Sequence, residues 1–563
     1  MIPYPSHIIR EYTANGWWGH DTLDSLFRRN VAQSPDAVAL VDPLNRAAFT
    51  DGESQRYTYR QLDEAVNRFA AALVAHGIGK DDVVAVQLPN IAELVMFYLA
   101  VARIGAIASP FPVQYREYEL EQLGNFADIK AFVTTTHIGD RKDADVIVGL
   151  RNKIPTLKTI FALGENVPDG VVALKLLMAM PHDAAMLDRY LKKLQVDANE
   201  VFTICWTSGT ESAPKGVPRT YNNWVAIAYA SIDAPELTER DHLLNPFPLV
   251  NMAGIGGMLF PWALTGSRLI MHHPFDLPTF LKQVAIEKIT YTVAPPALLT
   301  LLLMREEILK QADISSIRTI GSGSAPLSPF MVKTWLEKHK IQVTNLFGSN
   351  EGIALVGDAK TIPDPEQRAQ FFPRFGVDGF DWPARVSHGM QTKLVDANGA
   401  TITAAGQPGE MCVKGPTVFA GYHKGEELNQ RAFDSDGFFR TGDVFEIAGD
   451  GDRFYRYVDR AKDIIARGGM KIAPAELESL LAGHPKIAES AFVGYPDAVL
   501  GEKSCAFVVV KPGQTVTLDE VVEFLREKKI ASYKLPERLE VIEALPRNPV
   551  GKILKQNLRA KLK

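Results

Sequence analysis

The sequence predicts an α/β protein in which a large N-terminal domain with a β-rich portion precedes a small C-terminal α+β domain. In the first half of the chain, short apolar runs alternate with amphipathic segments of helical periodicity. This alternation is typical of a parallel sheet that helices cover on both faces. The chain has 563 residues, more than one hydrophobic core ordinarily supports. A charged stretch over residues 459–463 indicates a linker, so we expect domains at residues 1–460 and 461–563.

The elements of the large domain follow from hydrophobic periodicity. Between residues 60 and 76, four apolar side chains fall on one helical stripe, which Gly77 would end. Residues 138–200 carry weaker signals of the same kind. The clearest further elements are strands at 57–59, 83–86, 131–133, 291–294 and 317–320 and helices at 91–106 and 297–309.

The pattern changes toward the C-terminus of the chain. Residues 410–422 indicate a more β-rich portion, and a tight turn ending at Asp443 closes it. The part beyond the linker is a compact unit that mixes both kinds of element. It has predicted helices at 474–481 and 518–529 and predicted strands at 491–494 and 505–510.

The composition is that of an ordinary globular protein, with 46% hydrophobic and 23% charged residues. A net charge of −5 does not indicate a protein that binds nucleic acid. Cys205, Cys412 and Cys505 are far apart, so neither a disulfide nor a zinc site is predicted. No signal peptide and no stretch long enough to span a bilayer is found. We therefore expect a cytoplasmic protein.

The segment Thr207–Gly216 combines small and hydroxyl side chains with one lysine. It follows an apolar run over residues 201–206 and precedes Asn222 and Asn223, which are candidate caps of a helix. Small side chains let backbone N–H groups approach an anion, and the lysine adds a charge. We predict a phosphate cradle between strand and helix; the alternative is an ordinary surface turn. Val217 stands where the Walker pattern requires Ser or Thr, which disfavours a kinase-like P-loop.

Two further loops of small residues follow predicted strands. One covers residues 321–326 and the other residues 345–352. Open α/β sheets bind ligands in the crevice outside the carboxyl ends of their strands. We therefore expect these two loops and the phosphate cradle to define one crevice.

The order Thr-Ser-Gly-Thr and then Pro-Lys-Gly resembles the phosphate loop of the adenylate-forming (AMP-binding) superfamily, which holds acyl- and aryl-CoA synthetases, carrier-protein adenylation domains and luciferases. The resemblance to this superfamily covers most of the chain. Within the superfamily, the chain looks most like short- and medium-chain fatty-acid or cyclohexanecarboxylate-type acyl-CoA synthetases. Residues 501–511 also resemble dihydroxybenzoate-AMP ligases. The motifs that match in order are Thr207–Gly216, Phe247–Gly254, Ser324–Pro326, Phe347–Glu351, Thr441–Asp443, Arg460–Lys471 and Pro549–Lys552.

The resemblance implies a two-step reaction that uses ATP, Mg²⁺ and CoA. A carboxylate attacks the α-phosphorus of ATP, which gives an acyl-adenylate and pyrophosphate; a thiol then displaces AMP and forms a thioester. The anionic transition state of the first step needs positive charge. By resemblance, Lys552, Lys215 and Glu351 are catalytic: Lys552 bridges the carboxylate and the α-phosphate, and Glu351 with Thr207 holds Mg²⁺. Without the resemblance, Lys552 would be taken for a surface lysine.

The resemblance also implies the nucleotide contacts. Asp443 would accept hydrogen bonds from the ribose hydroxyls, and Asn345 would meet the adenine amino group. Phe347 would offer a face to the adenine, although a core position is the commoner fate of an aromatic residue. The implied nucleotide-binding positions are Thr207, Ser208, Gly209, Thr210, Lys215, Ser324, Ala325, Pro326, Asn345, Phe347, Gly348, Asn350, Asp443 and Arg460.

The small domain carries the remaining implied positions. Lys462, two residues after Arg460, would be the hinge about which the family rotates this domain between the two half-reactions. The rotation would withdraw Lys552 and bring Gly468 and Gly469 against the tunnel of the CoA thiol. Adjacent glycines permit a strand to border a narrow channel, although a plain turn is the alternative.

The sequence departs from the pattern of the family at several positions. Ser212 stands where glycine is frequent and Asn350 where threonine is frequent, but an asparagine can still donate to a phosphate oxygen. In dihydroxybenzoate ligases an asparagine meets the ring hydroxyl; here Val250 aligns with it and Asn251 follows. An apolar pocket favours an acid without a hydroxyl group. The predicted acid pocket contains Val250, Asn251, Met252, Gly323 and Gly348.

The sequence therefore predicts an ATP- and Mg²⁺-dependent carboxylate–CoA ligase for a short- to medium-chain or alicyclic acid. One alternative is an aryl-acid AMP ligase that loads the thiol of a carrier protein. Another is a nucleotide- or acyl-binding protein without turnover. The retained charges of Lys215, Glu351, Asp443 and Lys552 argue against the last, because a pure binder does not need groups that act on a transition state.

Overall fold

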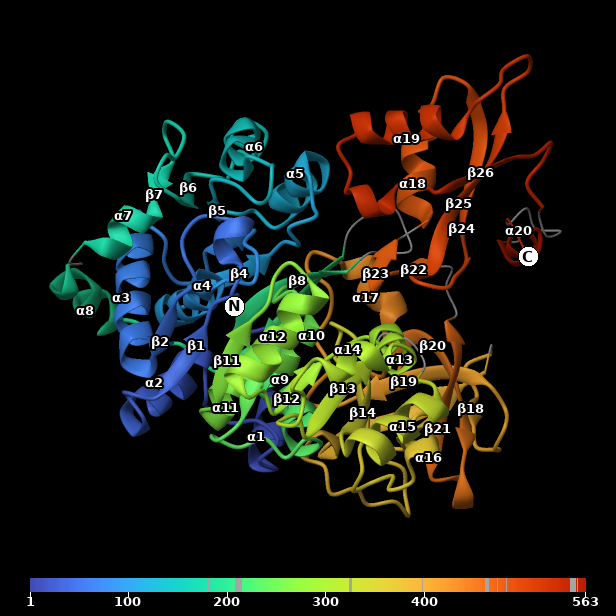
Figure 1. Ribbon diagram of the computed structural model, residues 1–563, viewed down its shortest axis with the longest axis horizontal. Coiled ribbons are helices and arrows are strands. Elements are labelled where there is room, and N and C mark those ends of the chain that lie inside the picture. The colour runs from blue at the N-terminus through green and yellow to red at the C-terminus, as the bar shows by residue number, and fades with distance from the viewer. Residues whose placement is uncertain are drawn as a thin grey trace. The chain divides into compact units, whose positions relative to one another are not determined.

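A computed structural model of the protein describes residues 1–180, 183–207, 215–323, 327–396, 398–460, 465–472, 474–481, 483–546, 553 and 555–562 (Figure 1). The chain forms two compact units. The first comprises Met1–Val113, Gly124–Trp206 and Gly216–Val458, and the second comprises Gln114–Leu123, Thr207–Lys215 and Asp459–Lys563. The predicted fold class, a large α/β part with a β-rich portion and a small α+β part, is confirmed.

A seven-stranded sheet has the order β7-β6-β5-β3-β4-β8-β9. Its strands from β7 to β8 pair in parallel. Continuous apolar runs such as that of β3 suit strands with both faces buried. The strands are β3 Val83–Val86, β4 Ile107–Pro110, β5 Ala131–Thr135, β6 Thr159–Leu163, β7 Val172–Ala173, β8 Val201–Thr207 and β9 Lys215–Thr220.

An eight-stranded sheet has the order β15-β14-β13-β12-β10-β11-β1-β2. Its inner strands are parallel, and the pairs at its two edges, β14 with β15 and β1 with β2, are antiparallel. The strands are β1 Val38–Val41, β2 Arg56–Thr58, β10 His242–Asn245, β11 Arg268–Met271, β12 Tyr291–Val293, β13 Thr319–Gly323, β14 Gln342–Gly348 and β15 Ala354–Gly357.

Helices connect the strands, and several begin at a residue that caps their first turn. Thr22, Thr58 and Thr220 each close a capping box, in which two backbone N–H groups are satisfied reciprocally. No helix in the described parts of the chain combines the length and the apolar character of a transmembrane span. The helices up to α8 are α1 Ser6–Ala14, α2 Leu23–Gln33, η1 Arg46–Ala48, α3 Tyr59–Ala75, α4 Ala92–Ile104, α5 Glu117–Phe126, α6 Asp143–Leu150, α7 Leu174–Ala179 and α8 Ala184–Leu191.

The later helices of the large part include one π-helix, η2, which links α10 to α11. The predicted helix over 297–309 is broken at Arg305 into two helices. These later helices are α9 Tyr221–Asp233, α10 Met252–Gly254, η2 Ile255–Leu259, α11 Phe260–Thr265, α12 Leu277–Glu287, α13 Pro296–Met304, α14 Glu306–Lys310, α15 Pro329–His339, α16 Pro365–Arg368, η3 Arg385–Ser387, α17 Glu426–Ala432 and η4 Asp450–Asp452.

The two faces of the eight-stranded sheet belong to different cores. Tyr291 and Val293 of β12 join a large cluster that includes residues of both sheets and of helices α3, α4, α9 and α11. Ala294 and Ile320 join a second cluster under helices α12, α13 and α15. Side chains alternate between the two faces along a strand, so neighbours on β12 point into different cores.

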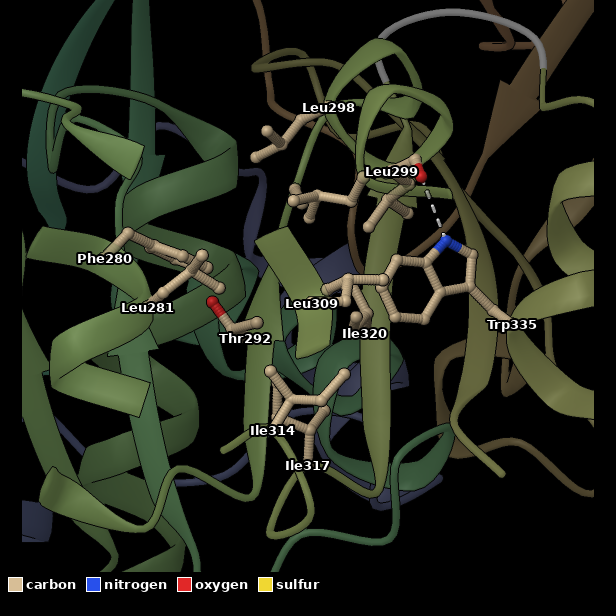
Figure 2. A pocket seen from close by; sticks show the side chains of 12 residues that line it. Phe280, Leu281, Thr292, Leu298, Leu299, Leu309, Ile314, Ile317, Ile320 and Trp335 are labelled. Atoms are coloured by element: carbon tan, nitrogen blue, oxygen red, sulfur yellow. Dashed lines mark hydrogen bonds between the residues drawn. The ribbon is translucent and has the colours of Figure 1, made fainter. Parts of the chain in front are cut away.

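The second core contains a small apolar cavity, shown in Figure 2. Its volume is about 20 Å³, room for about one water molecule. The hydroxyl of Thr292 in its lining donates to Leu244 O at 2.9 Å, and the Trp335 indole donates to Leu299 O at 3.2 Å. Because the remaining lining is apolar, we expect the cavity to stay dry, and it is too small for a substrate.

The β-rich portion of the first unit is a six-stranded antiparallel sheet. Its order is β16-β21-β20-β19-β17-β18. Phe347, at the end of β14, packs against this sheet: its ring lies 5.0 Å from that of Phe445 and 5.9 Å from that of Phe372. The strands are β16 Phe371–Pro373, β17 Gln391–Val395, β18 Thr401–Ile402, β19 Gly409–Lys414, β20 Phe439–Ala448 and β21 Phe454–Arg460.

The second unit contains a five-stranded sheet in the order β23-β22-β25-β24, with β26 beside β25. Leu477 and Leu481 of α18 and Val521 and Leu525 of α19 are buried in its core. The predicted helix over 474–481 is confirmed. The elements are β22 Ile465–Arg467, β23 Met470–Ile472, α18 Pro474–Leu481, β24 Ile487–Asp497, β25 Gly501–Val510, α19 Leu518–Glu527, η5 Ser532–Lys534, β26 Arg538–Val541 and α20 Lys555–Ala560.

A buried lysine links three segments of the second unit. Lys534 is 5% exposed, and its ammonium lies 3.2 Å from Glu119 and 2.9 Å from Glu476. Burial alone would lower the pKa of Lys534, but the two carboxylates raise it above its ordinary value. The lysine is therefore charged at neutral pH, and it pairs with two acidic groups in a largely buried place.

Replacement of Lys534 by methionine is expected to destabilise the protein by about 3–5 kcal/mol, because it leaves buried carboxylates without their partner. The matched control is Lys529→Met, whose salt bridge with Glu117 at 3.0 Å is solvent-exposed. That change is expected to cost less than about 1 kcal/mol. Denaturant titrations of the two variants measure the difference, and equal losses would contradict the burial argument.

The surroundings of the phosphate loop differ from the prediction. We expected a strand, the loop and then a helix, but the next element is strand β9, the neighbour of β8 in the sheet order. The helix α9 begins only after it, and its cap is Thr220; Asn223 completes the capping box from inside the helix, and Asn222 is not a cap. The predicted parallel strands also divide between two sheets, which local periodicity does not distinguish.

Candidate active site

The turn that follows β14 is the centre of the candidate site. Asn350 accepts a hydrogen bond from Met252 N through Oδ1 at 2.8 Å, and its amide nitrogen lies 3.5 Å from Trp206 O. A Cβ on Gly352 would lie 2.0 Å from Thr417 O, and the φ of Gly352 is +113°, so only glycine fits. The turn is thus tied to β8 and to the segment that carries the predicted acid pocket. Asn350, expected to donate to a phosphate oxygen, makes protein contacts here.

Arg219 of β9 supports the same turn from inside. Its guanidinium donates to Thr417 O at 2.7 Å, to Asn350 O at 3.2 Å and to Asn223 O at 3.2 Å. The residue is 0% exposed, and its guanidinium lies 4.9 Å from the centre of the Trp224 ring. Burial lowers the pKa of Arg219 to about 10, so the side chain stays protonated at neutral pH. The strand that begins at the phosphate loop is thereby fixed to the turn.

Glu351 is held at both its main chain and its side chain. Phe419 N donates to Glu351 O at 2.9 Å, and the Tyr422 hydroxyl donates to Glu351 Oε1 at 3.0 Å. Burial, and then the Glu351 carboxylate, raise the pKa of Tyr422. Tyr422 therefore remains a hydrogen-bond donor at neutral pH and fixes the orientation of the carboxylate.

The predicted adenine contacts lie beside this turn. Asn345 is buried, and its amide nitrogen donates to Arg368 O at 3.1 Å and to Ala369 O at 3.0 Å. These bonds orient the amide, and its Oδ1, which takes no part in them, is the atom that an amino group would contact. Phe347 is half-buried in the aromatic cluster with Phe445. The structure thus gives it a packing role, the commoner role weighed for it from the sequence.

Asp443 lies on β20, two residues before Phe445, so the packing of Phe445 against Phe347 brings its strand to the same region. It is 7% exposed, and its backbone N–H contacts the Thr441 hydroxyl at 3.1 Å. Gly442, with a φ of +72°, donates its N–H to Glu410 at 3.0 Å. The predicted tight turn before Asp443 is wrong, because residues 441–443 lie within strand β20, at an irregularity in its pairing with β19.

Of the predicted acid-pocket residues, Gly348 lies directly against Met252, and Gly323 lies against the neighbouring strand β14. A Cβ on Gly348 would lie 2.4 Å from Met252 Cε, and a Cβ on Gly323 would lie 2.2 Å from Leu346 O. The Asn251 side chain accepts the N–H groups of Ala253 at 3.0 Å and Gly254 at 3.4 Å, so it caps helix α10. The carbonyl oxygen of the Asn251 amide, one of the polar groups predicted for the pocket, is thus occupied in a helix cap.

The other predicted residues are placed only in part. Thr207 ends β8 and Lys215 begins β9, and Arg460 ends β21. Gly468 and Gly469 form the turn between β22 and β23, with φ angles of +55° and +82°. The predicted site residues Ser208, Gly209, Thr210, Ser324, Ala325, Pro326, Lys462 and Lys552 lie outside the described residues, as does Ser212.

Sequence reasoning missed Arg219 and Tyr422. Arg219 lies in a strand that is buried from Gly216 to Thr220, but its sequence, Lys-Gly-Val-Pro-Arg-Thr, is not an apolar run and gives no signal of this burial. Tyr422 ends a segment of aromatic residues and glycines, and nothing in that segment singles it out. Among the described residues, no group of three or more His, Cys, Asp or Glu side chains is arranged to hold a metal ion.

The comparisons with known proteins show the family of the chain. The family described as AMP-binding enzyme matches residues 27–423, and the AMP-binding enzyme C-terminal domain matches residues 476–552. The chain belongs to the AMP-binding enzymes. The likeness stated from the sequence motifs is therefore confirmed, and so is the prediction of an adenylate-forming enzyme that activates a carboxylic acid.

Three similar proteins show the range of this AMP-binding enzyme's relatives. A medium-chain fatty-acid–CoA ligase of Escherichia coli (strain K12) is 32% identical over 97% of this chain and 92% of its own. A 2,3-dihydroxybenzoate-AMP ligase of Bacillus subtilis (strain 168) is 28% identical over 99% and 97%. The ATP-bound structure of MatB from Rhodopseudomonas palustris is 26% identical with a TM-score of 0.63, over 96% and 99%. A CoA ligase and an AMP ligase both occur, so the relatives alone do not distinguish the two acceptors.

Proposed function

We propose that the protein is a carboxylate–CoA ligase that acts on a short- to medium-chain or alicyclic acid. The carboxylate oxygen would attack the α-phosphorus of ATP, and the bond from that phosphorus to the bridging oxygen would break, which releases pyrophosphate. The thiol of CoA, after loss of its proton, would attack the acyl carbon and expel AMP. The products are the acyl-CoA thioester, AMP and pyrophosphate.

The position of Asn251 as a helix cap is the observation that favours an apolar acid over a hydroxybenzoate. A hydroxybenzoate needs a partner for its ring hydroxyl, and an unpaired buried hydroxyl costs about 1–3 kcal/mol. The carbonyl oxygen of the Asn251 side chain accepts the N–H groups of Ala253 and Gly254 instead, which turns this side chain toward helix α10. The neighbouring Val250 and Met252 are apolar, and Val250 is buried. This supports an acid with an apolar body, in line with the name of the 32% identical relative.

Glu351 and Thr207 are the proposed ligands of Mg²⁺. A carboxylate and a hydroxyl are oxygen donors, which suit this ion, and one or two protein ligands are usual where substrate phosphates supply others. The hydrogen bond from Tyr422 presents the Glu351 carboxylate in a fixed orientation. When bound, Mg²⁺ would offset the negative charge of the phosphates. Lys215 would add positive charge there, and Asp443 would accept the ribose hydroxyls.

The second unit is proposed to serve the two half-reactions in turn. Lys552 would contact the carboxylate and the α-phosphate during adenylation, and Lys462 would be the hinge. Gly468 and Gly469 would border the path of the CoA thiol. Both have positive φ angles, which glycine adopts readily, and neither has a Cβ, so the tip of this turn carries no side chain. These assignments derive from the family resemblance stated above.

An activity panel tests the proposed function. The enzyme is incubated with ATP, Mg²⁺ and butanoate, hexanoate, octanoate, cyclohexanecarboxylate or 2,3-dihydroxybenzoate, with and without CoA. The expected result is release of AMP that depends on the acid and on CoA, with a thioester of an alkanoate or of the alicyclic acid. No acid-dependent AMP on any acid would reject the proposal. Hydroxybenzoate outperforming alkanoates, with a holo-carrier protein outperforming CoA, would establish the aryl-acid AMP ligase instead.

Replacement of Tyr422 by phenylalanine is expected to raise the Mg²⁺ concentration for half-maximal activity about 10-fold, because it frees the proposed ligand Glu351. The matched control is Tyr455→Phe, which removes a buried hydroxyl that lies 3.1 Å from the Thr392 hydroxyl. Each variant loses about 1 kcal/mol of stability. Mg²⁺ titrations of the adenylation rate measure the difference; an unchanged requirement in Tyr422→Phe would remove Tyr422 from the metal site.

A further inference from the structure

On one face of the eight-stranded sheet, strand β13 carries no side chains where the predicted acid pocket lies. Gly321 and Gly323 are two residues apart on β13, so they share a face of the sheet. Tyr291 and Val293 share the same face on the neighbouring strand β12, where Val293 pairs with Gly321. This is the face that packs against α9 and the helices from α10 to α11.

The glycines lead from the site into the core. Gly323 lies toward the carboxyl end of β13 and pairs with Leu346, two residues before Gly348. Ligands of open α/β sheets enter at the carboxyl ends of the strands. Gly321 lies two residues deeper, about 7 Å along the strand. An acid whose carboxylate stays near the Glu351 turn would therefore extend along Gly323 toward Gly321.

Tyr291 stands at the deep end of this path. A Cβ on Gly321 would lie 2.7 Å from the Tyr291 hydroxyl and 2.9 Å from a methyl group of Leu346. The Tyr291 side chain is 1% exposed, so its hydroxyl is directed into the protein beside Gly321. The tyrosine therefore occupies the space that the missing side chain of Gly321 leaves open.

Ser231 of α9 completes this barrier from the helical side. Burial raises the pKa of the Tyr291 hydroxyl, and the Ser231 side chain beside it opposes that rise. Ser231 is 6% exposed. A Cβ on Gly257 of the π-helix η2 would lie 3.7 Å from Ser231 Oγ and 3.8 Å from Met252 O. The Tyr291 hydroxyl, from the sheet, and the Ser231 hydroxyl, from the helices, therefore lie next to each other.

We propose that Tyr291 and Ser231 form the end wall of the acid pocket and thereby limit the enzyme to compact acids, a short alkyl chain or a single alicyclic ring. This inference rests on the proposed function and narrows it. A depth of about 7 Å between Gly323 and the level of Gly321 accommodates a short chain or one ring and not a long fatty acyl chain. Tyr291 and Ser231 are specificity residues in this proposal, without a part in the chemical steps.

The test compares kcat/KM over butanoate, hexanoate, octanoate, decanoate and dodecanoate in the wild type and in Tyr291→Ala. In the wild type, kcat/KM is expected to fall steeply once the acid is longer than the preferred chain length. The variant is expected to raise the ratio of kcat/KM for decanoate over hexanoate at least 10-fold, because each accommodated methylene is worth about 10-fold or more in a fitted apolar pocket. Tyr291→Leu keeps an apolar side chain in the core and serves if the alanine variant does not fold.

The matched control is Ile320→Ala, on the strand beside β12 but on the opposite face. Figure 2 shows Ile320 and Thr292 at the apolar cavity of the second core, the face that Tyr291 does not share. Ile320→Ala makes a comparable void and is expected to leave the acid profile unchanged. If the tyrosine variants keep the wild-type profile, or if Ile320→Ala changes it equally, the end wall is refuted while the ligase activity stands. A wild type inactive on every acid would refute the proposed function itself.

Discussion

Replacement of Lys552 by alanine is expected to slow the formation of the acyl-adenylate by about 10²–10³-fold, the effect of removing one preorganised charge from a transition state. The lysine is proposed to bridge the attacking carboxylate and the α-phosphate, where negative charge gathers. In the second half-reaction it has no such role, so thioester formation from a supplied acyl-adenylate should stay within a few-fold of the wild type. Pyrophosphate release measures the first step, and CoA thioester formation measures the second.

The control for this change is Lys561→Ala, an exposed lysine in the same C-terminal segment. It removes the same charge from the tail and should leave both half-reactions unchanged. Equal loss of the two half-reactions in the Lys552 variant would show that one arrangement of the second unit serves both steps. The proposed roles of Lys462 and of the Gly468–Gly469 turn would then fall as well.

Replacement of Arg219 by methionine is expected to lower kcat/KM about 10²-fold and to cost about 3 kcal/mol of stability. The guanidinium satisfies Asn350 O and Thr417 O in a place closed to water, and each buried carbonyl left unpaired costs about 1–3 kcal/mol. Asn350 precedes the proposed metal ligand Glu351, so its carbonyl fixes the turn that carries that ligand. A shift of about 1 Å at such a turn can cost about 10²-fold in rate.

A second buried arginine gives the matched control. Arg103 donates to Asp24 at 2.8 Å and to Asp63 at 2.7 Å, its side chain is 0% exposed, and none of these three residues belongs to the candidate site. Arg103→Met should destabilise at least as much, because it strands two carboxylates. Thermal melting checks that both variants are folded at the assay temperature, where Arg103→Met should keep its kcat/KM. If the two variants lose activity equally, Arg219 acts through stability alone.

Local sequence patterns predict much of this fold because helices and strands carry their own periodicity. Residues 474–481 form the predicted helix, and the strands over 83–86 and 291–293 lie where apolar runs predict them. The two loops of small residues predicted at 321–326 and 345–352 were placed too early, because β13 continues to Gly323 and β14 to Gly348. The family resemblance then added what no local pattern supplies, the partners of Glu351 and Lys552 in one reaction.

What the sequence did not predict depends on contacts between distant residues. The bond from Arg219 to Thr417 joins positions 198 residues apart, and no local pattern anticipates it. Strand β9 contains Pro218 and Arg219, which a propensity argument assigns to a loop, yet long-range hydrogen bonds and burial hold it in the sheet. Likewise, the division of the parallel strands between two sheets depends on which faces pack together.

The hydrogen bond from Met252 N to the side chain of Asn350 has a consequence for the redesign of this enzyme. Met252 borders the space proposed for the acyl group, and Asn350 adjoins the carboxylate proposed to meet the triphosphate. Substitutions that change the proposed acyl-binding residues for a new acid are expected to shift Asn350, and with it the proposed ATP-binding turn, through this hydrogen bond. Libraries that vary residues 250 to 252 should therefore be screened at several ATP concentrations, since selectivity gained for an acid will show up as an altered Michaelis constant for ATP.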